Sequence, residues 1–228
     1  MQSSPPSTHH PGSDWRRFAL WRGPLGLLLI GLVSVALAAL YANGFINASA
    51  ENANQLPAHY RETPIPILVH ILVGTLLVLL IPVQFAVVIR QRWPRFHRAT
   101  GRVLAVCVLF MGMTSLWMNT FYPAFGGTAK YLGVLMHVIV LVGGLAWALV
   151  AIRQGQVKQH RLGMMCMTAA ALSPAVQRII AIPLYVLLGH FSDWMIGLLV
   201  WLGLLVNLAF VAWIASRKTT FPVYLENN

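Results

Sequence analysis

The chain has 228 residues, of which 58% are hydrophobic and only 9% are charged. Soluble domains carry about 25% charged residues, so this composition argues against a water-soluble fold and favours an integral membrane protein. The formal net charge of +11 does not call for a nucleic-acid partner. The basic residues gather beside apolar segments, where they meet the anionic headgroups of the lipid bilayer.

The two ends of the chain are predicted to be tails. Residues 1–22 begin with MQSSPPSTHHPGSD, which is rich in Pro, Ser and Gly and cannot bury a core. We therefore expect a disordered cytoplasmic tail over residues 1–22. A second cytoplasmic tail is expected over residues 217–228, after the last apolar segment.

Six apolar runs lie between these tails, and each is long enough to cross a membrane as a helix. A hydrocarbon core of about 30 Å takes about 20 helical residues. The runs are residues 24–50, 63–89, 103–129, 131–152, 162–177 with a continuation after Arg178, and 194–216. We therefore predict an all-α integral membrane protein with one domain of six transmembrane helices over residues 23–216.

Basic residues mark every second junction between the runs. They are Arg16, Arg17 and Arg22, then Arg90, Arg92, Arg95, Arg98 and Arg102, then Arg153, Lys158 and Arg161, and finally Arg217 and Lys218. The other junctions carry only Arg61 and Lys130. This asymmetry is the positive-inside pattern, and it predicts a bacterial inner-membrane protein with both termini in the cytoplasm.

A short internal repeat suggests how the central helices are arranged. IRQRWPRFHR at residues 89–98 and IRQGQVKQHR at residues 152–161 share the pattern IRQ, five residues, HR, and lie 63 residues apart. His70 and His137 each lie near the start of the preceding apolar run. We therefore predict a central four-helix bundle of two parallel two-helix repeats, at about residues 65–125 and 131–188, with the first and last helices peripheral.

The repeat places four histidines at two depths. At 1.5 Å per helical residue, His70 and His137 lie roughly 8–9 Å inside the outer boundary of the membrane. His97 and His160 lie at the cytoplasmic ends of the third and fifth predicted helices. A pseudo-twofold axis would pair His70 with His137 and His97 with His160. Facing imidazoles can ligate haem iron axially, so the sequence predicts haem b as cofactor and these residues as iron ligands.

Two haems at these depths would make the chain a transmembrane electron carrier. As an enzyme it would be a membrane oxidoreductase, with a small molecule or a protein as electron donor or acceptor. Arg178 interrupts the fifth run at about the depth of the outer histidines. An intramembrane arginine marks a functional site, and its guanidinium matches a haem propionate or an anionic donor.

Other interpretations of the same residues stay open. Arg178 can snorkel to the interface, His97 and His160 can contact lipid phosphate, and His70 and His137 can form interhelical hydrogen bonds. The histidines and Arg178 can also line the path of a small permease or metal-ion carrier. A structural subunit of a membrane complex is a further possibility. The sequence has no nucleotide-binding loop, hydrolase elbow or HExxH motif.

Several of these residues lie in motifs that resemble a known family. HRATGR and HRLGMM, each beginning with a histidine of the repeat, resemble the bacterial predicted membrane proteins grouped as domain of unknown function 2306. The matching positions are His70, Gly74, Gln84, residues 97–102, residues 160–165 and Arg178. The resemblance covers about residues 66–185 and implies the membrane fold and these positions, without an activity.

A more distant likeness is architectural. Six helices with histidines on the central four are similar to the di-haem transmembrane cytochromes of the b-561 type. Those proteins pass electrons from ascorbate to acceptors across a membrane. This resemblance implies a transmembrane electron carrier, which is also the function that the paired histidines predict.

Overall fold

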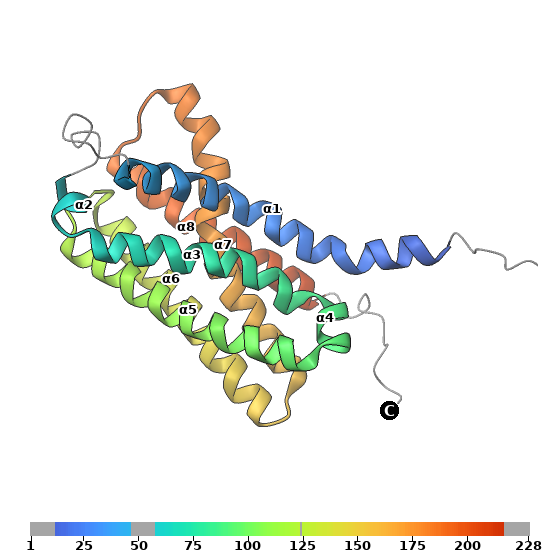
Figure 1. The fold of residues 1–228 in the computed structure, drawn as a ribbon. Coiled ribbons are helices and arrows are strands. Elements are labelled where there is room, and N and C mark those ends of the chain that lie inside the picture. Colours follow the sequence, from blue (N-terminus) through green and yellow to red (C-terminus); the bar gives the residue numbers. More distant parts are fainter. Residues whose placement is uncertain (1–11, 47–57, 124, 217–228) are drawn as a thin grey trace, which may run out of the picture.

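The protein is helical throughout the residues that a computed structural model describes, which are 12–46, 58–123 and 125–216 (Figure 1). The elements are α1 (Gly12–Ile46), α2 (Ala58–Glu62), α3 (Pro64–Phe85), α4 (Val87–Arg92), α5 (Pro94–Phe121), α6 (Gly127–Arg153), α7 (Val157–Leu188) and α8 (Asp193–Ser216). The prediction of an all-α fold is confirmed for these residues.

Five helices, α3 and α5 to α8, are long and apolar enough to cross a membrane. In α1 the apolar stretch that the structure describes is Arg22–Leu37, shorter than the about 20 residues that a span takes. The chain is therefore a multi-pass membrane protein, and the sixth span stays a prediction. α1 begins at Gly12, so the last part of the predicted tail at residues 1–22 is helical. Residues 1–11 and 217–228 lie outside the described residues.

The outside of the bundle is apolar, as a lipid-facing surface should be. Large side chains are exposed along the helices, and at the end of α7 Val186 and Leu187 are 78% and 80% exposed. In water such a surface would be an aggregation site, whereas in a bilayer it meets acyl chains. The surface therefore agrees with the membrane assignment that composition gave.

The sequence predicted a single helix for the second apolar run, but the structure divides this run into two helices. α3 ends at Phe85, and Ala86 has extended backbone (φ −72°, ψ 106°) before the short helix α4. α4 ends in turn at Arg92, and Trp93 has non-helical backbone (φ −132°, ψ 65°) just before Pro94. A residue before proline avoids helical backbone because the proline ring crowds it, so α5 starts afresh at Pro94. Arg90 and Arg92 thus lie on a separate basic turn.

α5 and α7 begin at equivalent positions of the sequence repeat. Pro94 and Val157 are the first residues of these helices and lie 63 residues apart. The backbone N–H of His97 donates to the Trp93 carbonyl at 3.0 Å, and that of His160 donates to the Gln156 carbonyl at 2.9 Å. The preceding connections differ, because α4 leads into α5 whereas a short turn joins α6 to α7.

The four central helices share one core. Buried side chains from α3, α5, α6 and α7 meet there, together with one from α8: Val73, Leu77, Ile81, Leu104, Cys107, Val108, Leu141, Leu145, Met167, Ala170 and Leu204. α3 packs against α5, α5 against α6, and α6 against α7. α1 lies on α3 and α7, and α8 lies on α6 and α7. α1 is thus peripheral, whereas α8 contributes Leu204 to the core, and the structure does not confirm that the bundle is a true repeat.

Glycines allow α6 and α7 to meet at backbone distance. A Cβ atom added at Gly144 would lie 2.8 Å from the backbone nitrogen of Met167, and one at Gly163 would lie 2.8 Å from that of Ala148. Small residues at helix contacts are a common device for packing in membranes, where apolar side chains gain little by leaving lipid. This close approach sets the position of α7, which carries His160 and Arg178.

Candidate functional site

His70 is held by a hydrogen bond that determines which of its nitrogens carries the proton. Its Nδ1 lies 3.1 Å from the Thr114 hydroxyl on α5. That hydroxyl donates its own proton to the Phe110 carbonyl at 2.8 Å, so it accepts from His70. The imidazole therefore carries its proton on Nδ1 and keeps a lone pair on Nε2.

Arg178 lies on α7 close to this imidazole. Its Nη1 donates to the Ser34 hydroxyl of α1 at 3.0 Å, and its positive charge acts on His70. The side chain therefore extends between helices, and this contact favours the functional interpretation of Arg178 over simple snorkelling. We call His70, Thr114, Arg178 and Ser34 the outer site. Its members come from α1, α3, α5 and α7.

His137 has a different environment from His70. Its Nδ1–H donates to the Gly133 carbonyl, one turn back on its own helix, at 2.8 Å. His70 lies on α3, which packs on α1 and α5, whereas His137 lies on α6, which packs on α5, α7 and α8. The pairing of His70 with His137 stays a prediction.

The two inner histidines lie within electrostatic reach of each other. His97 interacts with His160 and with the charges of Arg90 and Arg98. His160 donates its Nδ1–H to the Ala148 carbonyl of α6 at 2.9 Å. The Nδ1 atom of His97 is buried and has no hydrogen-bond partner. We call His97, His160, Arg90, Arg98 and Arg161 the inner cluster.

The inner cluster is strongly electropositive. Burial, and next the guanidinium of Arg161, lowers the pKa of Arg90 from its ordinary value. Like charges repel one another, so an anion beside these guanidinium groups would be stabilised. The cluster can therefore hold a phosphate or a carboxylate.

Gln84 ties α3 to the start of α5 beside this cluster. Its amide nitrogen donates to the Thr100 hydroxyl at 2.7 Å and to the His97 carbonyl at 3.3 Å. Gly101 makes room for this contact, because a Cβ atom there would lie 3.2 Å from Gln84 Oε1. A buried amide at this depth fixes the position of His97 on α5.

The structure thus brings His70 to Arg178 and His97 to His160. Spacing in the sequence did not identify Thr114 and Ser34, whose partners lie 44 and 144 residues away. A hydroxyl within an apolar run was the only available signal. Among the described residues, no three or more His, Cys, Asp or Glu side chains gather to hold a metal ion.

A family model described as "Predicted membrane protein (DUF2306)" matches residues 67–215, which is more than half of the chain. The matched segment includes all four histidines of the repeat and Arg178. No curated protein and no solved structure matches the chain. The likeness to the b-561 cytochromes is therefore not shown.

Proposed function

We propose that this chain, which belongs to the DUF2306 family of predicted membrane proteins, binds haem b at the outer site and carries electrons across the membrane. Membership in the family supports a multi-pass membrane protein and supplies no activity. The proposal therefore rests on the geometry of the outer site.

One observation carries the proposal, namely the hydrogen bond between His70 Nδ1 and the Thr114 hydroxyl. Histidines that ligate a metal usually donate their other N–H to an oxygen acceptor, which orients the ring and raises its basicity. His70 does this through Thr114, which leaves the lone pair of its Nε2 as the ligating group. His137 and His160 also donate Nδ1–H to a carbonyl oxygen.

The residues of the outer site fit the two chemical parts of haem b. A neutral imidazole nitrogen is a common axial ligand for haem iron. The guanidinium of Arg178 matches a propionate carboxylate, and Ser34 holds that guanidinium towards α1. When bound, haem would supply reversible one-electron transfer at its iron.

The full proposal includes two haems and six spans. His137 would be the second ligand of the outer haem, and His97 with His160 would hold an inner haem. The equivalent starts of α5 and α7 support the repeat on which this depends. α1 would be the sixth span. Figure 1 supports this topology, because α1 begins and α8 ends towards the same end of the bundle as α4.

A permease is the second candidate. An anionic substrate would use the same pair, with His70 as a hydrogen-bonding group and Arg178 as its counter-charge. The contact between Arg178 and Ser34 of peripheral α1 favours this alternative, because movement of α1 would open the site. In that case the purified protein would be colourless.

The experiment is a visible spectrum of the protein purified in detergent after expression with added haem precursor. We expect a Soret band that His70→Ala reduces by the share of the outer haem, which is about half if the inner haem is also bound, and that is kept in His190→Ala, an exposed histidine outside the spans. Loss of the inner haem alone in His160→Ala would support the two-haem arrangement. A folded protein without a Soret band, or an unchanged band in His70→Ala, would contradict the proposal.

A further inference from the structure

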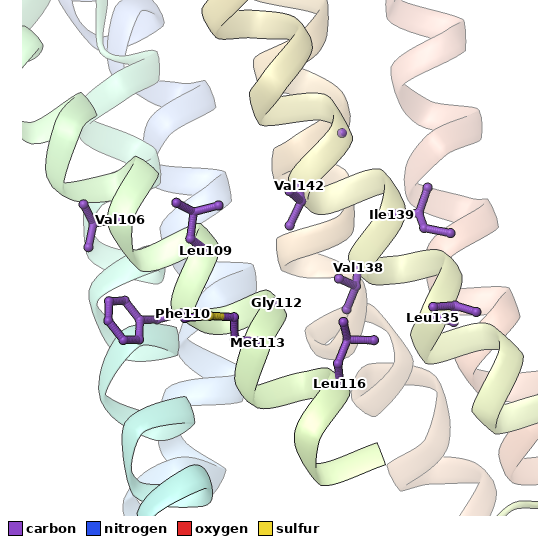
Figure 2. Close-up of a pocket in the computed structure, with 11 residues that line it drawn as sticks. Val106, Leu109, Phe110, Gly112, Met113, Leu116, Leu135, Val138, Ile139 and Val142 are labelled. Atoms are coloured by element: carbon purple, nitrogen blue, oxygen red, sulfur yellow. The ribbon is translucent and has the colours of Figure 1, made fainter. Parts of the chain in front are cut away.

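An apolar groove runs between α5 and α6 on the outside of the bundle (Figure 2). Its volume is about 570 Å³, and apolar side chains and glycines line it. Figure 2 shows Leu116 of α5 and Val138 and Val142 of α6 pointing into the space between the two helices. No residue of the outer site lines this groove.

Two glycines shape the groove in different ways. At Gly112 an added Cβ atom would lie 3.0 Å from Val142, so this glycine brings the helices together. At Gly143 an added Cβ atom would meet nothing within 4 Å, so this glycine leaves the groove open. The groove is therefore narrow where Gly112 meets Val142 and wider beside Gly143. A flexible hydrocarbon chain can follow a groove of such uneven width.

An arginine continues each wall of the groove towards the same end. On α5 the exposed Arg102 precedes the lining residues Val106, Leu109 and Met113 at three- and four-residue spacing, so all four share one face. On α6 the exposed Arg153 follows Val142 by three helical turns.

Both arginines lie at a similar distance along the groove. The helices run in opposite directions and touch where Gly112 meets Val142. From that level, at 1.5 Å per residue, Arg102 lies about 15 Å away and Arg153 about 17 Å away, both towards the end where α5 begins. α5 and α6 contain no acidic residue to neutralise them.

We propose that this groove binds one acyl chain of an anionic phospholipid, whose phosphate is held by Arg102 and Arg153. The apolar walls suit the acyl chain, and guanidinium groups bind phosphate oxygens through paired hydrogen bonds. Because neither helix offers a carboxylate, nothing there would attract the ammonium group of a zwitterionic lipid. The site takes a phosphatidylglycerol-like lipid in preference to phosphatidylcholine. This inference does not depend on the haem proposal.

Native mass spectrometry of the detergent-purified protein tests the site. Phosphatidylglycerol and phosphatidylcholine with identical acyl chains are added in turn. We expect phosphatidylglycerol to be retained at least about tenfold more strongly, because each arginine near the headgroup adds to the attraction. The double variant Arg102→Gln/Arg153→Gln should abolish this preference. Arg22→Gln, at an exposed arginine of α1, is the control and should preserve it.

A second variant tests the groove itself. Gly143→Leu fills the open space and should lower the retention of both lipids, whereas Gly26→Leu, at an equally open glycine of α1, should not. If Gly143→Leu fails to fold, Leu116→Trp fills the groove from α5. Equal binding of the two lipids, or unchanged binding in the filled-groove variants, would overturn the proposal. So would a dimer whose cross-links cover the groove.

Discussion

Three of the four histidines in the repeat donate their Nδ1–H to an oxygen atom, but they do so in different ways. His137 bonds to a carbonyl of its own helix, and His160 bonds to a neighbouring helix. Of these three, only His70 is held by a side chain of another helix, and the guanidinium of Arg178 also acts on it. Its orientation therefore depends on the packing of three helices, which makes His70 the best-supported ligand of the set.

The hydroxyl of Thr114 should be required for this orientation. Thr114→Val keeps the shape of the side chain and removes the acceptor for His70, so haem affinity should fall about 10-fold or more. The matched control is Thr75→Val, because the Thr75 hydroxyl donates only to the Ile71 carbonyl of its own helix. Haem titration followed at the Soret band measures both variants. Equal affinities would show that Thr114 does not position His70.

At the scale of helices, the sequence predicted the apolar segments well and their ends less well. The break at Ala86 lies inside an uncharged apolar run, so hydropathy gives no sign of it. Pro94 was the available signal for the start of α5, since the residue before a proline avoids helical backbone. α7 continues through Pro174, Arg178 and Pro183, because in a bundle neighbouring helices satisfy the groups that a proline frees.

A polar side chain also joins α8 to α7 near Pro174. Asn207 donates its amide to the Ala169 carbonyl of α7 at 3.0 Å, near the proline at position 174. Ser173 donates to the same carbonyl at 2.7 Å. Asn207→Leu should therefore weaken the contact between α7 and α8 by about 0.6–2 kcal/mol. Thermal unfolding in detergent, followed by circular dichroism, measures this loss, and an unchanged melting temperature would contradict the role of Asn207.

Neighbouring glycines of α6 allow a stricter test of helix packing. Gly144→Ala places a methyl group 2.8 Å from the Met167 backbone, which has no flexible end to move, so we expect about 1–3 kcal/mol of destabilisation. Gly143→Ala meets nothing and should be neutral or slightly stabilising, because alanine favours the helix. Melting temperatures of the two variants compare these effects directly. Equal values would mean that α6 and α7 do not approach as described.

At the scale of the whole molecule, composition and charge were enough to predict a multi-pass helical protein. Hydrophobic runs and the uneven distribution of arginine and lysine are each summed over many residues, so the prediction of membrane spans does not depend on the interpretation of any single residue. The outer site could not be predicted in the same way. Arg178 and Ser34 are joined only when α1 lies on α7, and no local pattern in the sequence specifies that contact.

Cysteine labelling tests the predicted topology. With the native cysteines replaced, single cysteines at Ser13, Glu62, Gln156 and the exposed His190 are treated with a membrane-impermeant reagent in intact cells. Six spans with the amino terminus in the cytoplasm predict labelling at positions 62 and 190, and protection at positions 13 and 156 until the membrane is opened. Labelling at both 13 and 62 in intact cells would show that α1 does not cross the membrane.

The central claim is that His70 and Arg178 hold one ligand together, and a double-mutant cycle tests it most directly. Haem affinity is measured for the wild type, His70→Ala, Arg178→Gln and the double variant. One shared haem predicts that the double variant loses clearly less binding free energy than the two single losses combined, by about 0.5 kcal/mol or more. Strictly additive losses, or no saturable haem binding by the folded wild type, would contradict the account.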